Sequence, residues 1–316
     1  MRRGIYLVAN RKSQEMCENL IYSIRESGCA LPIRLIHFGG DTIKSDFISS
    51  QVELLSYEDF STEAKSFIAN LRTVLTDCPL GFLYRFLALF GDWDEFIYSD
   101  NDVVALRNWE EMLEYLSDSD IVHADNEYLT GGIFNYNQPE EVKKLFGNEA
   151  LTSAFTAGHM AIRKSGKLIS DINEAIEWFK KYPSIPKKHD QALLHVASLL
   201  GNWRVLNLCK PSLGWLSSWA GDYKNSLMLI HSLQKGNKIS HLHYSGSTPL
   251  GNLPVEELLL SNKSAKKRLG SLLAVSLKEF SGFFKFQFYR NKGKRKLIEL
   301  KGEFLNPRAS TDLNNT

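Results

Sequence analysis

The sequence has few cysteines, no long apolar run and almost no net charge. Its four cysteines, at positions 17, 29, 78 and 209, show no CxxC spacing. They are too few and too scattered for a disulfide framework, so we expect reduced thiols and a cytoplasmic protein. No apolar run approaches the roughly 20 residues that cross a bilayer, and Arg85 interrupts the most apolar region, Pro79–Phe90. The sequence therefore predicts no membrane-spanning helix.

A signal-peptide pattern is also missing at the start of the sequence. The apolar run Gly4–Ala9 follows two arginines, but the polar segment Asn10–Lys12 comes directly after it. A signal peptide needs roughly 7–15 apolar residues at this point, so we expect Gly4–Ala9 to be a first buried strand.

The small net charge conceals an uneven distribution. The chain has 38 Lys+Arg against 36 Asp+Glu, a formal charge of +2. Residues 262–302 contain 12 Lys or Arg against two Glu and so carry +10, which leaves −8 for the remainder. This pattern predicts an acidic body followed by a basic, aromatic tail.

Short apolar segments alternate with amphipathic ones along the body. We expect strands at Gly4–Ala9, Ile33–Phe38, Val52–Leu55, Glu95–Ser99, Asp120–His123, Ala154–Arg163 and Ile239–His243. We expect helices at Ser13–Ser27, Thr62–Leu75, Leu80–Phe90, Asn108–Leu116, Ser165–Lys181 and Asp190–Leu200, and an irregular segment at Trp203–Trp219. This alternation predicts an α/β fold with a mostly parallel central sheet, in which ligands bind beyond the carboxyl ends of the strands.

Acidic residues follow the apolar strand Glu95–Ser99 where it leaves the sheet. Asp100 and Asp102 are two positions apart, so an extended chain would direct both carboxylates to one point. Oxygen ligands of this kind suit Mg²⁺ or Mn²⁺, although a D-x-D triplet alone also fits a solvated turn. Asp92 and Asp94 have the same spacing but precede the strand, so position favours a metal site only at Asp100 and Asp102.

Five further segments stand in a fixed order around this triplet and together span Gly4 to Pro249. They are Ile5–Asn10, Phe82–Leu89, Phe155–Ile162, His189–Gln191 and His243–Pro249. In this order they resemble the motifs of glycosyltransferase family 8, whose members have the Rossmann-like GT-A fold and transfer sugars from nucleotide-sugars with retention. Thr156 stands where that family usually has Asn, and the loop after His243 lacks the family's Lys and Trp.

The resemblance implies a metal-dependent glycosyltransferase that moves a sugar from a UDP-sugar to a glycan or lipid-linked acceptor. It implies Asp100, Asp102 and His243 as ligands of Mn²⁺ or Mg²⁺, and Asp190 and Gln191 as catalytic residues at the anomeric carbon. The donor contacts that it implies are Ala9, Asn10, Arg85, Asp100, Asn101, Asp102, Ala157, Gly158, Gly246 and Ser247.

Several of these roles have alternatives. His241 lies two residues before His243 and would face the same side of a strand, so either imidazole fits the metal. Asp190 also fits a helix N-cap, and Gly158 fits either room for the sugar or tight packing. Arg85 must meet an anion, which is either a structural carboxylate or the donor. Front-side transfer and a double displacement through a carboxylate both fit these residues.

The predicted domains are residues 1–255, with a nucleotide-sugar half at 1–125 and an acceptor half at 126–255, and a basic helical tail at 256–316. The tail suits a peripheral anchor on an anionic membrane at its inner face through residues 262–302. A helical hairpin packed on the body is the alternative, and nucleic acid is the less favoured polyanion.

Two other function classes remain open from the sequence. A sugar-phosphate nucleotidylyltransferase would need a glycine-rich loop after the first strand, and Ala9–Ser13 has no glycine. A non-catalytic sugar- or nucleic-acid-binding module would keep the fold without turnover.

Overall fold

The computed structural model of the chain describes residues 1–41, 43–131, 134–223, 229, 232–233 and 235–245. All of them belong to one compact unit, Met1–Leu250. Gly246, Ser247 and the predicted tail at 256–316 lie outside the described residues. All four cysteines are free thiols, and every helix within the described ranges is too short or too polar to span a bilayer.

The described part contains nine strands, eight α-helices and seven short 3₁₀ helices. The strands are β1 (Arg3–Ala9), β2 (Ile33–His37), β3 (Glu53–Leu55), β4 (Glu95–Ser99), β5 (Val103–Ala105), β6 (Ile121–His123), β7 (His159–Arg163), β8 (Val205–Asn207) and β9 (His241–His243). The α-helices are α1 (Gln14–Glu26), α2 (Asp46–Gln51), α3 (Thr62–Arg72), α4 (Leu80–Tyr84), α5 (Glu110–Leu113), α6 (Pro139–Phe146), α7 (Gly166–Lys181) and α8 (Asp190–Leu200). The 3₁₀ helices are η1 (Arg11–Ser13), η2 (Tyr57–Asp59), η3 (Arg85–Phe90), η4 (Glu114–Ser117), η5 (Glu127–Thr130), η6 (Ala150–Ser153) and η7 (Ala220–Asp222).

Seven strands form the central sheet in the order β3-β2-β1-β4-β7-β6-β8. All neighbouring pairs are parallel except the two that involve β7, which runs antiparallel to β4 and to β6. The prediction of a mostly parallel α/β sheet is therefore confirmed. Because β7 is reversed, its amino end lies at the same edge of the sheet as the carboxyl end of β4.

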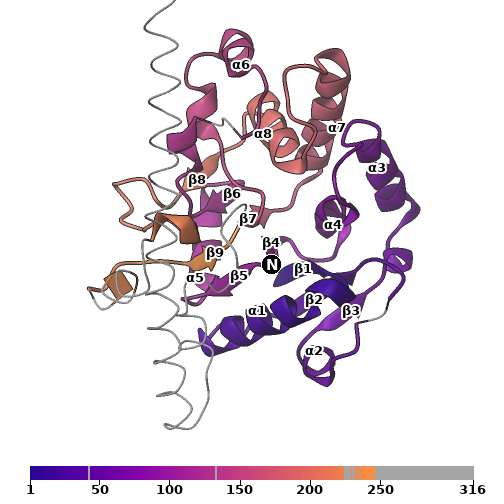
Figure 1. Cartoon of the computed structure of the whole chain (residues 1–316), viewed down its shortest axis with the longest axis vertical. Helices are drawn as coiled ribbons and strands as arrows, with labels where there is room; N and C mark the ends of the chain where they lie inside the picture. Colours follow the sequence, from indigo (N-terminus) through magenta and orange to yellow (C-terminus); the bar gives the residue numbers. More distant parts are fainter. Residues whose placement is uncertain (42, 132–133, 224–228, 230–231, 234, 246–316) are drawn as a thin grey trace, which may run out of the picture. The chain divides into compact units, whose positions relative to one another are not determined.

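Helices cover both faces of the sheet. In β1, Ile5, Leu7 and Ala9 pack into a core with α1, α2 and α5, whereas Tyr6 and Val8 pack into a core with α3, α4, α7 and α8. Since successive side chains of a strand alternate between faces, a strand buried on both sides is apolar throughout. Figure 1 shows α1 and α2 on one side of β1, and α3 and α4 on the other.

A second, two-stranded sheet pairs β5 with β9 in antiparallel register. β5 begins one residue after Asp102, and Val103 lies opposite His243. This pairing brings a segment near residue 243 next to the acidic triplet, and it positions the candidate site.

The structure corrects some predicted boundaries. The strand predicted at Ala154–Arg163 begins only at His159, because the preceding residues leave the sheet and line a cavity. The helix predicted at Leu80–Phe90 is α-helical only to Tyr84 and continues as the tighter η3. The segment Trp203–Trp219, predicted to be irregular, contributes β8 to the edge of the sheet.

Candidate active site

A cavity of about 1080 Å³ lies beyond the carboxyl ends of β1 and β4. The residues that line it come from both halves of the described chain. They include Val8, Asn10, Arg85, Asp100, Asn101, Asp102, Asp125, Glu127, Thr156, Ala157, Gly158, Asp190, Gln191 and His243. Small-molecule pockets usually measure roughly 300–1,000 Å³, so this cavity has room for a ligand larger than a single sugar.

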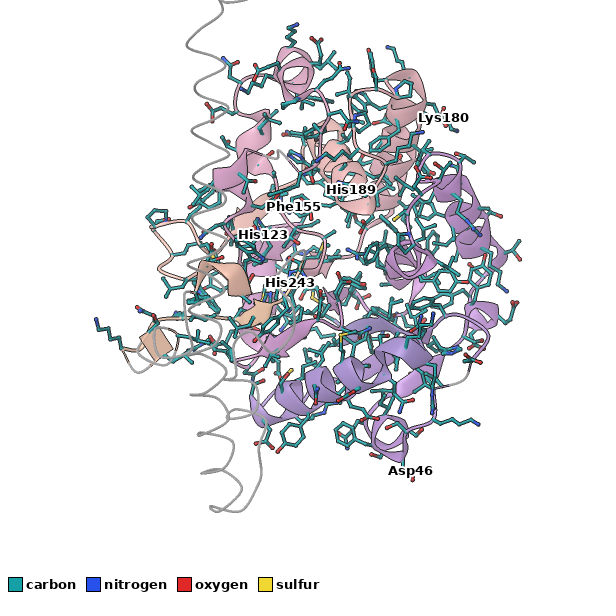
Figure 2. The ribbon with its side chains drawn as sticks, in the orientation of Figure 1. Asp46, His123, Phe155, Lys180, His189 and His243 are labelled. Carbon is teal, nitrogen blue, oxygen red and sulfur yellow. The ribbon has the colours of Figure 1, made fainter. Side chains whose placement is uncertain are left out.

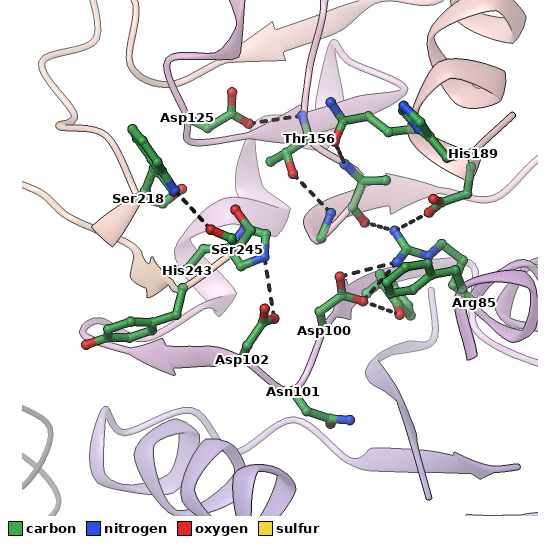
Figure 3. A pocket seen from close by; sticks show the side chains of 18 of the residues that line it. Arg85, Asp100, Asn101, Asp102, Asp125, Thr156, His189, Ser218, His243 and Ser245 are labelled. Carbon is green, nitrogen blue, oxygen red and sulfur yellow. Dashed lines mark hydrogen bonds and ion pairs between the residues drawn. The ribbon is translucent and has the colours of Figure 1, made fainter. Parts of the chain in front are cut away.

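Asp100, Asp102 and His243 form a three-residue cluster on the cavity wall (Figure 3). One ligand atom from each residue lies within 4.8 Å of the other two, and His243 Nε2 is 3.5 Å from Asp102 Oδ1. The β5–β9 pairing explains this proximity, and the Tyr244 N–H also donates to the Asp102 carbonyl at 2.9 Å. The expected convergence of the two carboxylates is therefore present.

His243, and not His241, joins the aspartates. The His241 ring is 1% exposed and packs on the His159 ring with centroids 3.7 Å apart. Because the pairing with β5 is offset by two residues, His241 lies opposite Ala105, away from the acidic triplet. Of the two histidines, His243 is the one that lies beside the aspartates, and its role as a metal ligand stays a prediction.

Gly158 makes room for His243. A Cβ atom at Gly158 would lie 2.2 Å from His243 Cε1 and 3.1 Å from Asp100 Oδ2. The Gly158 carbonyl also accepts the Asp100 N–H at 2.7 Å. Of the two roles expected for this glycine, the structure supports tight packing, and the neighbour is the metal-ligand candidate itself.

Arg85 is buried and meets two carboxylates. Its Nη2 lies 3.0 Å from Asp100 Oδ1, its Nη1 lies 2.8 Å from Asp190 Oδ2, and Nη1 also donates to the Ala157 carbonyl at 2.6 Å. Tyr98 donates its hydroxyl to Asp100 Oδ1 at 2.6 Å. The anion expected for Arg85 is therefore a pair of aspartates, and the guanidinium links the metal-ligand candidate to the predicted catalytic residue.

The electrostatics of the cluster favour a cation. Burial raises the pKa of Asp100; Arg85 opposes this rise and the nearby Asp102 charge adds to it. Burial also acts to raise the pKa of Asp102, but the His243 contact outweighs it and leaves that pKa lowered. Burial acts to lower the pKa of His243, yet the two aspartates raise it above its usual value. A divalent ion would replace the His243 proton, so ion binding and proton release are coupled.

The start of α8 differs from the expectation that Asp190 is the N-cap. His189 occupies that position, and its Nδ1 accepts the Ala192 N–H at 3.3 Å. The Asp190 side chain is thereby free to pair with Arg85. Gln191 lines the cavity, where its Oε1 accepts the Ala157 N–H at 3.4 Å and its Nε2 donates to Asn135 at 2.9 Å.

The other predicted donor contacts among the described residues line the cavity, with one exception, whereas Gly246 and Ser247 lie outside the described residues. Ala9 is fully buried and does not line the cavity. Asn10 lines it while capping η1, with Oδ1 accepting from the Lys12 and Ser13 N–H groups. Asn101 donates to the Val8 carbonyl at 2.7 Å, and its Oδ1 has no partner among the described residues.

A buried pair that the sequence patterns did not single out lies at the end of β6, and its Asp125 lines the cavity. His123 Nδ1 contacts Asp125 Oδ2 at 2.7 Å, and Asp125 also accepts the Glu127 N–H at 2.7 Å. The His123 ring packs on Phe155 in the interior, whereas Asp46 and Lys180 lie at the periphery (Figure 2). The alternating polar residues after the strand Ile121–His123 carried the signal that would have identified them.

The cluster fits a divalent metal ion. Two carboxylates and one imidazole suit Mn²⁺, and Mg²⁺ is accommodated by carboxylates with water. The nearby Asp102 charge acts to raise the pKa of Asp100, and the pairing of β9 with β5 holds His243 beside Asp102. The chemistry of the donor set therefore agrees with the predicted metal site.

Comparisons with known proteins agree with this fold. A family model described as a putative mannosyltransferase matches residues 2–119, little more than a third of the chain. No curated protein matches. The apo structure of the bifunctional glycosyltransferase WbbM is similar at a TM-score of 0.53 and 14% identity, over 86% of this chain and 51% of WbbM. This chain thus spans about half of that structure's length.

Two other solved structures are similar at lower scores. The first is mouse xyloside xylosyltransferase 1, with a TM-score of 0.49 and 11% identity over 79% of this chain and all of that one. The second is the galactosyltransferase LgtC in complex with donor and acceptor sugar analogs, with a TM-score of 0.48 and 14% identity over 85% of this chain and 99% of that one. The particular resemblance to glycosyltransferase family 8 stays a prediction. The similarity to WbbM supports the α/β architecture of the GT-A fold for this chain, and the family model covers residues 2–119 alone.

Proposed function

We propose that this chain transfers a sugar from a nucleotide-sugar to a glycan or lipid-linked acceptor, with a divalent metal ion and with retention. The observation that carries the proposal is the convergence of Asp100, Asp102 and His243 on the wall of a large cavity. The nucleotide that the family resemblance implies is UDP. Mannose is also a candidate sugar, because the family model that matches residues 2–119 is described as a putative mannosyltransferase.

Asp100, Asp102 and His243 would hold Mn²⁺ or Mg²⁺. When bound, the ion supplies positive charge to the diphosphate of the donor and stabilises the negative charge that develops as it leaves. Tyr98 and Arg85 fix the Asp100 carboxylate by hydrogen bonds, so this ligand is oriented before the ion arrives.

Asp190 and Gln191 would lie beside the anomeric carbon. Arg85 Nη1 pairs with Asp190 at 2.8 Å, and this ion pair makes the carboxylate a weaker nucleophile. This pairing favours front-side transfer, in which the leaving phosphate accepts the acceptor's proton, over a covalent intermediate on Asp190. A glycosyl group trapped on Asp190 and detected by mass spectrometry would contradict the front-side route.

The direct test is a thermal-shift screen of nucleotide-sugars with and without Mn²⁺. UDP-glucose, UDP-galactose, UDP-N-acetylglucosamine and GDP-mannose form a sufficient first panel. A ligand that binds only the folded state stabilises it by about 2.7 kcal/mol at a hundredfold excess over Kd. We expect a Mn²⁺-dependent shift with at least one donor, and a flat response to all four would refute the proposal.

The chain provides its own control for the metal site. Asp102→Asn should remove the Mn²⁺-dependent shift and the release of nucleoside diphosphate. Asp92→Asn changes a D-x-D aspartate at the other end of the strand, where the carboxylate pairs only with Arg34 in the described part of the chain, and should leave both unchanged. Equal effects of the two substitutions would contradict a metal role for Asp102.

We also propose a peripheral location at the inner face of an anionic membrane through residues 262–302. The support is the charge of +10 and the six aromatic residues of this segment. The full chain should sediment with phosphatidylserine vesicles but not with phosphatidylcholine vesicles, and high salt should release it. Sedimentation that is indifferent to lipid charge would contradict this location.

A further inference from the structure

Exposed apolar side chains are concentrated at the cavity. Of eight large apolar side chains that are exposed in the described residues, four line the cavity: Phe82 at 41%, Leu129 at 69%, Phe134 at 56% and Trp219 at 40%. Large apolar groups left in water at the edge of a cavity are typical of a surface that contacts a ligand.

Three of these side chains, together with two carboxylates, come from the part of the chain that follows β6. We call Glu127, Leu129, Phe134, Trp219 and Asp222 the acceptor rim; all five line the cavity. Glu127 and Leu129 belong to η5, which follows β6, whereas Trp219 is the N-cap of η7 and Asp222 is its last residue. Asn126 Nδ2 donates to Asp222 Oδ2 at 3.3 Å and joins the two segments.

The acceptor rim lies next to the candidate metal site but on the side away from β1. Trp219 forms a backbone bridge with His243, and the His243 N–H donates to the Ser218 carbonyl at 2.8 Å. In the sheet, β1 is on one side of β4 and β6 is on the other, beyond β7. If the diphosphate of a donor is held at the end of β4, the part of the cavity next to β6 therefore stays available for a second substrate.

The carboxylates of the acceptor rim have no cationic partner among the described residues. Glu127 Oε1 accepts from Thr130 at 3.3 Å and from Gln191 at 3.4 Å, both neutral donors. Arg85, a buried cation on the cavity wall, is already paired with two aspartates. Free carboxylate oxygens accept hydrogen bonds from hydroxyl groups and repel anions.

A buried hydroxyl on the same wall also has no partner. Ser218 lines the cavity, is 1% exposed, and its Oγ makes no hydrogen bond to any described residue. An unpaired buried hydroxyl is unfavourable unless a ligand or water completes its hydrogen bond. This observation is independent of the carboxylates and points to a polar ligand beside Trp219.

We propose that the acceptor rim binds the terminal pyranose of an uncharged saccharide. The exposed indole of Trp219 offers a flat surface for the C–H face of the sugar ring, and the carboxylates accept from its hydroxyls. Gly221 allows this placement, because a Cβ there would lie 2.5 Å from Trp219 Cζ2. The proposal rests on the proposed glycosyl transfer, since it assigns the acceptor of that reaction.

The test is saturation-transfer NMR on the full chain with UDP and Mn²⁺ present. The probes are methyl β-D-glucopyranoside, methyl β-D-galactopyranoside and methyl α-D-mannopyranoside, together with the matching methyl uronosides. We expect contact with at least one neutral glycoside and at least about tenfold weaker contact with its uronoside, which corresponds to 1.4 kcal/mol.

Variants locate the contact. Trp219→Ala should reduce the neutral-glycoside signal at least about fivefold, and Trp219→Phe should retain most of it, because the aromatic face remains. Phe47→Ala removes an equally exposed aromatic that does not line the cavity and should have no effect. Asp222→Asn should reduce the difference in contact signal between the methyl uronoside and the matching neutral glycoside.

Several outcomes would overturn the acceptor rim as a saccharide site. They are the absence of contact with all three neutral glycosides, equal contact with the uronosides, or signals unchanged by Trp219→Ala. If octyl glycosides bind and methyl glycosides do not, the acceptor rim binds an alkyl chain instead. Mn²⁺-dependent release of nucleoside diphosphate, measured on the same protein preparation with a nucleotide-sugar in place of UDP, tests the transfer reaction separately, so failure of one is distinguishable from failure of the other.

Discussion

Removing the Arg85 guanidinium would leave the buried Asp190 and the half-buried Asp100 without their shared partner. Asp100 and Asp190 lie 3.0 and 2.8 Å from it, and the Arg85 side chain is 5% exposed. Truncating one partner of a buried ion pair destabilises a protein by about 3–5 kcal/mol. In a folded unit of this size each kcal/mol shifts Tm by about 2–4 °C, so Arg85→Ala should lower Tm by about 6–20 °C.

The assay is thermal unfolding of the full chain followed by circular dichroism in EDTA, so that no metal ion offsets the loss of Arg85. The control is Arg204→Ala, because Arg204 is 57% exposed and pairs with Asp120; it should change stability by no more than about 1 kcal/mol. A Tm loss for Arg85→Ala no larger than that of the control would refute the reasoning.

The pH dependence of this variant has a defined sign. Burial already raises the pKa of Asp100 in the presence of Arg85, and removal of the guanidinium should raise it further. The folded variant then binds more protons than the unfolded chain, so its free energy of unfolding falls as pH rises through that range. The gap between wild type and Arg85→Ala should therefore be larger at about pH 7.5 than at about pH 5, and a gap that widens on acidification would contradict this account.

Two further predictions concern the metal-ligand geometry and a core histidine. In Gly158→Ala the added Cβ would overlap the His243 ring, so Mn²⁺ affinity measured by calorimetry should fall at least about tenfold, or 1.4 kcal/mol. Gly166→Ala, whose Cβ meets nothing within 4 Å, should bind Mn²⁺ as wild type does; equal affinities in both variants would argue against the packing role of Gly158. Burial lowers the pKa of His195 to about 4, so acidification from about pH 6.5 to 4 should protonate this residue only in the unfolded chain and lower the free energy of unfolding by up to about 1.4 kcal/mol per pH unit. Chemical unfolding of His195→Gln should show a slope shallower by about one proton, and an unchanged slope would exclude His195 as its source.

The strongest sequence patterns predicted the centre of the fold well. The apolar runs at Gly4–Ala9 and Glu95–Ser99 became β1 and β4 within one residue, because strands buried on both faces need continuous apolar side chains. The acidic triplet after β4 could be located for the same reason. Its position follows from where a buried strand must end.

The parts of the fold and of the candidate site that depend on residues far apart in the sequence were harder to predict from it. β5 has three residues, and nothing within Val103–Ala105 specifies that it pairs with residues 241–243. That pairing decides which histidine joins the aspartates. Similarly, the sequence required an anion for Arg85, but only the tertiary structure brings Asp190 to it, since His189 takes over the N-cap position.

The reversed strand β7 has a consequence for how substrates enter. β7 hydrogen-bonds to β4 on one side and to β6 on the other, and the Asp100 N–H donates to the Gly158 carbonyl at 2.7 Å. The strands β4, β7 and β6 therefore form one continuous hydrogen-bonded ladder beside the metal-ligand candidates. Hinge closure between β4 and β7 would break this ladder, so for the proposed transfer we expect substrate capture by side-chain rotation and loop movement around this part of the sheet.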